Sequence, residues 1–158
     1  MVLILWLATV IVLFWKLQFQ YETQWFTFDG STLGIPASPK IGHQLVVHFI
    51  DPECPCTRFS KPHIEALEET FKDLNITFKS VNPGLAPVNQ MGLSAVPASP
   101  AVAVWNEAGE LSYFGPYSKG ALCGEGEDLL RPVLRQEIRG QLTHQEAIGC
   151  FCQWPIPV

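Results

Sequence analysis

Basic residues are scarce in this chain. Its 158 residues include 10 Lys and Arg against 15 Asp and Glu, which gives a net charge of −5. Because a nucleic-acid partner requires a basic surface, this balance argues against one. Internal repeats and low-complexity tracts are also absent. A hydrophobic content of 47% beside 16% charged residues is typical of a folded domain and not of a disordered chain.

Charge is missing from the start of the chain. Residues Met1–Trp15 carry no charged side chain, and with Lys16 as a snorkelling residue the apolar stretch reaches Phe19. A helix of this length spans about 28 Å, near the hydrocarbon thickness of a bilayer. A cleaved signal peptide needs a basic start and a small-residue cleavage site, and neither precedes Tyr21. A buried core helix is the other alternative. We predict a transmembrane anchor over residues 1–19, with the membrane as a partner.

Two cysteines separated by one proline follow an apolar run. Residues 44–50 are apolar enough for a buried strand, and residues 57–74 place apolar side chains three and four apart, which predicts a helix. The pair Cys54 and Cys56 therefore lies at a helix N-terminus, where a thiolate is favoured. A thiolate is both the nucleophile of disulfide exchange and a soft metal ligand. The residues alone indicate thiol chemistry of one kind or the other.

The remaining pattern predicts further elements in the order strand, helix, strand, helix, hairpin, helix. Strands are expected at 44–50, 75–81, 101–105 and 110–114, and helices at 57–74, from after Gly84 to Met91, and at about 129–139. This order indicates a central mixed β-sheet with helices on both faces. The expected organisation is an anchor at 1–19, a connector with a short β-element at 20–42, a domain at 43–142 and a cysteine-containing tail at 143–158.

The cysteine turn resembles that of the thioredoxin superfamily, over roughly residues 40–140. Thioredoxins have an apolar strand that ends in Phe, four residues, a Cys-Gly-Pro-Cys turn and a proline five positions after the second cysteine. Here Phe49, Cys54 and Pro62 fall in the same register, while Thr57 stands at the usual resolving position and the second thiol is Cys56. The resemblance implies a thioredoxin-like three-layer sandwich, joined here to a transmembrane helix.

The same resemblance suggests a cis-proline before the strand 101–105. Pro100 fits that position by its distance to Gly109, and Pro97 is the second choice. A cis-proline there would present the preceding backbone to a substrate strand beside the thiols. His48 stands next to the position at which the strand ends, where thioredoxins have a buried acid. It would move the proton of the resolving thiol; a satisfied core histidine is the alternative.

The function implied is that of a bacterial thiol-disulfide oxidoreductase of the oxidase or isomerase type. Cys54 would attack, Cys56 would release the mixed disulfide, and Pro100 would shape the groove. A disulfide across one residue is strained, which favours an oxidising couple. No cofactor is expected, and the partners would be protein thiols or disulfides in the cell envelope. Five cysteines in a chain of this length fit an oxidising compartment better than the cytosol. We therefore expect a single-pass protein of the bacterial inner membrane whose soluble domain faces the periplasm.

The tail repeats the Cys-x-Cys spacing at Cys150 and Cys152. With Cys123 these residues form a candidate second couple, although Cys123 could instead staple the tail. The alternative to redox exchange is a soft-metal site for copper, held by Cys54, Cys56, Cys150 and Cys152, in a copper carrier or a metalloenzyme assembly factor. No histidine adjoins either pair, and only two Met are present. A redox-inert interaction module is the third hypothesis.

Overall fold

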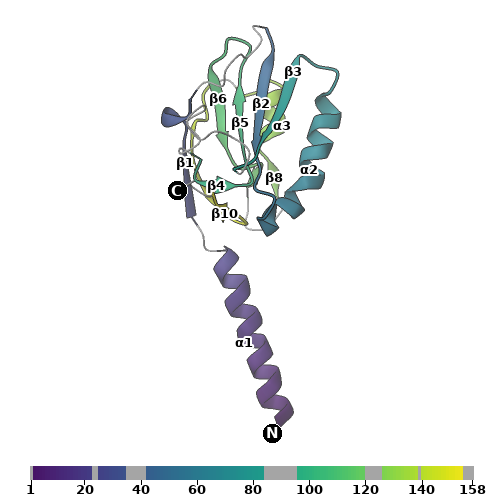
Figure 1. The fold of residues 1–158 in the computed structure, drawn as a ribbon, viewed down its shortest axis with the longest axis vertical. Coiled ribbons are helices and arrows are strands. Elements are labelled where there is room, and N and C mark those ends of the chain that lie inside the picture. Colours follow the sequence, from purple (N-terminus) through teal and green to yellow (C-terminus); the bar gives the residue numbers. More distant parts are fainter. Residues whose placement is uncertain are drawn as a thin grey trace.

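The computed structural model describes residues 2–22, 25–34, 42–83, 96–119, 126–138 and 140–154 (Figure 1). Helix α1 (Val2–Glu22) extends away from the rest of the chain, and its large apolar side chains as far as Leu17 are exposed. The other elements form one body around a central sheet, and both cysteine segments lie in this body.

The central sheet has four strands in the order β3-β2-β5-β6. Their bounds are β2 Gln44–Phe49, β3 Ile76–Val81, β5 Ala101–Trp105 and β6 Leu111–Gly115. Strand β2 is parallel to β3 and antiparallel to β5, and β5 is antiparallel to β6. Every residue of β2 and β5 is buried. These two strands are therefore covered on both faces.

Both α-helices of this body, as far as the structure describes it, pack on one face of the sheet. They are α2 (Pro55–Phe71) and α3 (Leu130–Leu134). One core cluster joins side chains of α2, α3 and the strands: Ile64, Leu67, Phe71, Leu130, Val133, Leu134, Val46, Val102 and Val104. The side chain of Asp128 caps α3, since its Oδ1 accepts hydrogen bonds from Leu130 N and Arg131 N at 2.9 and 3.0 Å.

The opposite face is covered by short strands and by the C-terminal segment. Strand β1 (Trp25–Asp29) pairs antiparallel with β9 (His144–Ile148), and β4 (Ala98–Ser99) pairs antiparallel with β10 (Cys152–Gln153). The remaining elements are η1 (Gly30–Thr32), β7 (Ser118–Lys119) and β8 (Glu127–Asp128). The core cluster on this face of the sheet is rich in aromatic side chains and includes Phe28, Phe49, Phe114, Phe151 and Trp154.

The predicted three-layer sandwich with helices on both faces and a transmembrane helix is therefore wrong. The described chain is mixed α/β with small sheets, and β1, β9 and the tail occupy the place of a second helical layer. The reason is that the segments expected to be a connector and a tail contribute apolar side chains to the core, among them Phe28 and Phe151. The helix predicted to run to Met91 lies outside the described residues.

The predicted membrane anchor is also wrong. Over the described residues, which include the side chains of α1 as far as Leu17, no helix is both long and apolar enough to cross a membrane. Within α1 the uncharged run ends before Lys16, short of the roughly 20 apolar residues that a span requires. The predicted inner-membrane location, with a domain facing the periplasm, depended on this anchor and is corrected with it.

Candidate functional site: two joined cysteine pairs

The turn after β2 places two cysteines at the start of α2. Cys54 is the N-cap residue of α2 and Pro55 is its first residue, a position where proline's fixed φ suits the helix. The turn is closed by Cys54 N, which donates to Asp51 O at 3.2 Å. Thr57 Oγ1 donates to the same carbonyl at 2.8 Å. Thr57 therefore helps to hold the turn.

Ser99 joins this turn to β4. Its side chain is completely buried, and its Oγ accepts a hydrogen bond from Asp51 N at 2.8 Å and donates to Phe49 O at 3.3 Å. Its carbonyl oxygen lies 3.5 Å from Sγ of Cys54. The Ser99–Pro100 peptide bond is cis, at the position that the sequence indicated. Whether Pro100 acts on a substrate stays a prediction.

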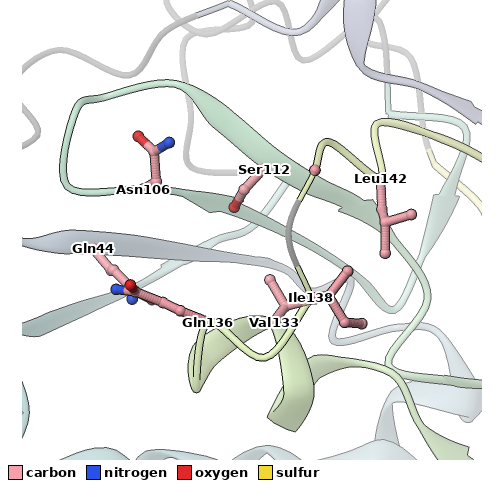
Figure 2. Close-up of a pocket in the computed structure, with 8 residues that line it drawn as sticks. Gln44, Asn106, Ser112, Val133, Gln136, Ile138 and Leu142 are labelled. Carbon is pink, nitrogen blue, oxygen red and sulfur yellow. The ribbon is translucent and has the colours of Figure 1, made fainter.

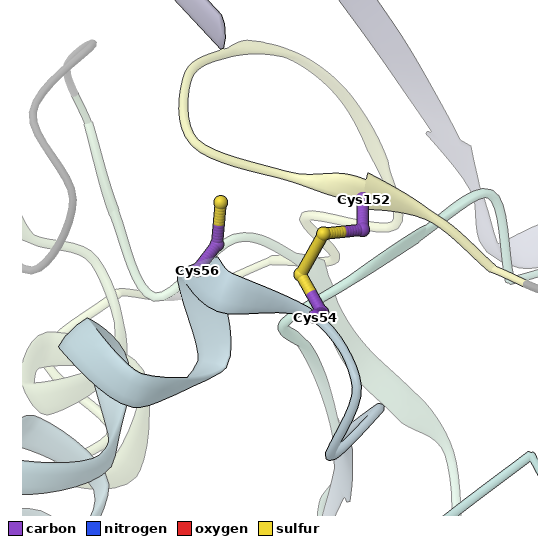
Figure 3. A group of neighbouring side chains, drawn as sticks. All are labelled: Cys54, Cys56 and Cys152. Carbon is purple, nitrogen blue, oxygen red and sulfur yellow. A yellow bond between two sulfur atoms is a disulfide. The ribbon is translucent and has the colours of Figure 1, made fainter.

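The two Cys-x-Cys segments are joined to one another. Cys54 forms a disulfide with Cys152, and Cys56 forms one with Cys150, with Cα–Cα distances of 5.8 and 5.6 Å. Figure 3 shows the Cys54–Cys152 bond with Cys56 beside it. The predicted couple between Cys54 and Cys56 is not the pairing in this structure. The predicted disulfide spans one intervening residue, whereas each observed disulfide joins two segments that are more than 90 residues apart in sequence.

Three of the four sulfur atoms form a compact cluster. The Sγ atoms of Cys54, Cys56 and Cys152 all lie within 4.8 Å of one another. Cys54 and Cys56 are buried, at 4% and 1% exposure, whereas Cys152 is half-buried. Sulfurs this close can exchange disulfide partners with little movement of the backbone, and as free thiolates they could bind one soft metal ion.

His48 lies on the α2 face of the sheet. Because side chains alternate along a strand, it faces α2 while its neighbour Phe49 faces the C-terminal segment. Its Nδ1 is 2.6 Å from the hydroxyl of Tyr117, and its Nε2 is 3.5 Å from Oε1 of Glu68. Burial lowers the pKa of His48 to about 4, so the ring is neutral at pH 7. The predicted proton transfer from a cysteine stays a prediction.

A cavity of about 330 Å³ lies at the other end of β2 (Figure 2). It is lined by Gln44, Asn106, Ser112, Val133, Gln136, Ile138, Gly140 and Leu142. Among the described residues, Oε1 of the buried Gln44 has no hydrogen-bond partner. No sequence pattern pointed to this cavity. The described residues of its lining carry amides and a hydroxyl but no thiol, imidazole or carboxylate, so the cysteine cluster is the stronger candidate site.

Two residues of the site were not found from the sequence. Ser99 could have been found, because it directly precedes the predicted cis-proline. Tyr117 could not, since its contact with His48 joins positions 69 residues apart. Burial raises the pKa of Tyr117 well above its usual value, so its hydroxyl stays protonated. Cys123, the fifth cysteine, lies outside the described residues.

The fold and the site together define a mixed α/β domain that carries two joined Cys-x-Cys segments. The chain belongs to the family described as a domain of unknown function, DUF6436, whose model matches residues 23–154. A comparison with curated proteins gave no match. The resemblance of the cysteine turn to thioredoxins stays a prediction.

Solved structures of two bacterial proteins are similar in fold. A hypothetical protein from Sinorhizobium meliloti 1021 has a TM-score of 0.53 and 12% identity, over 85% of this chain and 92% of that one. An uncharacterized conserved protein from Geobacillus kaustophilus has a TM-score of 0.58 and 11% identity, over 85% of this chain and 97% of that one. At such low identity the likeness shows the fold alone.

Proposed function

We propose that this protein carries out thiol–disulfide exchange, in the oxidising or isomerising direction, with protein thiols or disulfides as its substrates. Cys54 exchanges with the substrate, and the tail pair is its internal partner. The observation that carries the proposal is the cluster of three sulfurs from two Cys-x-Cys segments that are already joined as disulfides. The resemblance of the turn to thioredoxins adds support, since it assigns to Cys54 the position that exchanges with the substrate.

The oxidising reaction balances without a cofactor. A substrate thiolate attacks Sγ of Cys54, an S–S bond forms between them, and the Cys54–Cys152 bond breaks with its electron pair on Cys152, which takes up a proton. A second substrate thiol then attacks the sulfur bound to Cys54 and releases Cys54 as a thiolate. One substrate dithiol becomes a disulfide, and one protein disulfide becomes two thiols.

The helix favours the second step. Cys54 is the N-cap residue of the 17-residue helix α2. Unpaired N–H groups and the positive end of the helix dipole stabilise a thiolate there, which makes Cys54 a good leaving group. Pro100 would shape the groove in which the substrate lies, as the resemblance implies.

The disulfide of Cys56 allows the site to accept a second pair of electrons. Its sulfur lies within 4.8 Å of those of Cys54 and Cys152, while its own bond is to Cys150. Once that bond is reduced, the Cys56 thiolate is placed to release a mixed disulfide at Cys54. The Cys56–Cys150 bond therefore acts as a reserve that exchanges with the Cys54–Cys152 bond.

A stoichiometric oxidation tests this proposal. The full-length protein, purified without reductant, is mixed with an excess of a peptide that carries two thiols, and products are quantified by alkylation and mass spectrometry. We expect a peptide disulfide to form for each protein disulfide that is lost. The Cys54→Ser variant should react at least about tenfold more slowly, because the favoured leaving group is gone. Wild-type protein that leaves the peptide reduced would contradict the proposal.

Cys123→Ser is the matched control, because it makes the same chemical change outside the two joined pairs. An unchanged rate assigns the exchange to those pairs. A rate as low as that of Cys54→Ser would instead place Cys123 in the relay.

The sulfur cluster also favours a second candidate function. When both disulfides are reduced, the thiolates of Cys54, Cys56 and Cys152 lie close enough to ligate one soft ion, with Cys150 from the same tail. Thiolates suit Cu(I), and copper is the ion that the sequence suggested. An anaerobic titration of the reduced protein with Cu(I), followed by native mass spectrometry, tests this role. One tightly bound ion that Cys56→Ser loses supports a metal-binding protein, and no bound ion excludes it.

A further inference from the structure

The tail of the chain is bound as a strand beside the cysteine turn. Cys152 lies opposite Ser99 and Gln153 opposite Ala98 in an antiparallel pair. Trp154 N then donates to Pro97 O at 3.1 Å, which continues the backbone contact by one residue. Figure 1 shows β10 lying along β4, at the end of the sheet where α2 begins. Backbone pairing of this kind accepts many sequences, because it uses groups that every residue has.

Side chains of the tail fill two apolar positions next to the disulfide. Trp154 is 3% exposed, and its ring packs on Phe49 in a T-shaped arrangement, with a centroid distance of 6.0 Å and an interplanar angle of 89°. The ring of Phe151 is 8% exposed and packs on Phe26 and Phe28, with centroid distances of 5.7 and 6.0 Å. Gln153, between Cys152 and Trp154, is exposed.

We propose that the tail occupies the protein's own substrate groove, and that the substrate is an extended polypeptide segment with a large aromatic residue two positions after its cysteine. This inference rests on the proposed function. Backbone groups of β4 would bind the segment, the site of the Trp154 ring would select its aromatic residue, and Cys54 would form the mixed disulfide. Once the Cys56–Cys150 bond is also reduced, an apolar residue before the cysteine would take the place of Phe151, whereas the position of Gln153 imposes no selection.

The tail must give way as such a segment binds. Cys54 is only 4% exposed, and the tail is bonded to its sulfur. In the exchange step the substrate thiolate attacks Sγ of Cys54, the Cys54–Cys152 bond breaks, and Cys152 departs as a thiolate with the residues that follow it, while the Cys56–Cys150 bond still holds the start of the tail. A tethered segment competes at a high effective concentration, on the order of millimolar. The tail is therefore a competitor as well as a redox partner, and weakening its docking should speed the reaction.

The first test is the rate at which a short peptide reacts with the full-length oxidised protein. The probe is the peptide Gly-Phe-Cys-Gln-Trp, and the product is its disulfide adduct on Cys54, detected by mass spectrometry. We expect Trp154→Ala to raise the adduct rate by about tenfold, the equivalent of losing one buried aromatic contact. Trp25→Ala is the control, because Trp25 is 66% exposed. Replacing the peptide's Trp by Ala should lower the rate by about tenfold.

Equal rates for the Trp and Ala peptides would overturn the inference. Disulfide-linked dimers in place of the peptide adduct would assign the groove to the tail of a second copy, and would overturn it as well.

A second measurement does not depend on a variant or on redox chemistry. The reduced wild-type protein is mixed with Gly-Phe-Ser-Gln-Trp, which has no thiol, and amide hydrogen exchange is followed in residues 96–100. Protection of these amides by the peptide is expected, and its absence overturns the groove. Protection without any exchange by the thiol peptide would leave the groove standing and reject the proposed function. Thiol exchange without preference for the aromatic residue would reject the groove and leave the proposed function standing.

Discussion

Burial governs the chemistry of single residues in this protein. The sulfurs of Cys54 and Cys56 are almost inaccessible, so their reactivity depends on the segment that covers them. The ring of His48 is completely buried and lies between Phe78 and Tyr117, with interplanar angles of 4° and 13°. The carboxylate of Glu68 approaches His48, but that side chain is 42% exposed and water screens its charge. Burial therefore prevails, and His48 is neutral.

His48 makes the folded state sensitive to acid. The pKa of His48 is about 4 in the folded state against the ordinary histidine value of 6.5, so between these pH values only the unfolded chain gains the proton. The free energy of unfolding should therefore fall by about 3 kcal/mol as pH drops from 6.5 to 4, and this contribution is constant outside that range. Urea unfolding at a series of pH values measures it. His48→Gln should flatten the curve over this window, and His144→Gln, the same substitution at an exposed position, is the control. An unchanged slope in His48→Gln would refute the assignment.

At the scale of elements, the sequence was a good guide to local structure. Strands expected at 44–50, 75–81, 101–105 and 110–114 are found at 44–49, 76–81, 101–105 and 111–115. The helix expected at 57–74 runs from 55 to 71. These elements follow from periodic patterns of apolar residues, which are local. The prediction placed the end of α2 too late, because Leu74 continues the apolar spacing of the helix and yet is 54% exposed.

Two leucines near the end of α2 separate the buried face from the exposed one. Leu67 is fully buried between α2 and the sheet, while Leu74 lies just beyond the helix and is largely exposed. We expect Leu67→Ala to lower the free energy of unfolding by about 2–5 kcal/mol, through lost burial and a residual cavity. Leu74→Ala makes the same change in composition and should cost less than about 0.5 kcal/mol. Equal effects in denaturant unfolding would show that α2 does not pack as described.

At the scale of the whole molecule, the two cysteine pairs bind the last described segment to the first helix of the sheet domain. The repeated Cys-x-Cys spacing predicted a thiol cluster if the tail folds back, and the tail does fold back. Which cysteine pairs with which could not be predicted, since it depends on the strand pairing of Cys152 with Ser99. The packing of Phe28 and Phe151 on one face of the sheet was equally inaccessible, because it joins segments from opposite ends of the chain.

These crosslinks should contribute much of the stability. They close loops with sequence separations of 98 and 94 residues, and a disulfide across a loop of that size stabilises by about 2–5 kcal/mol through the unfolded chain. Reduction by a dithiol should therefore lower the urea midpoint of the wild-type protein markedly. A variant with Cys150→Ser and Cys152→Ser should have the lower midpoint with or without reductant. A wild-type midpoint that reductant leaves unchanged would rule out a structural contribution from these bonds.

The central claim is that the two Cys-x-Cys segments are joined to each other, and a tryptic map without reductant tests it most directly. Cleavage after Lys40, Arg58 and Arg139 releases peptides 41–58 and 140–158, each with one Cys-x-Cys pair, while Cys123 falls on a third peptide. The account predicts one linked species of these two peptides that separates on reduction and gains four hydrogens, two for each disulfide. Two separate peptides, each with an internal disulfide or with free thiols, would contradict it.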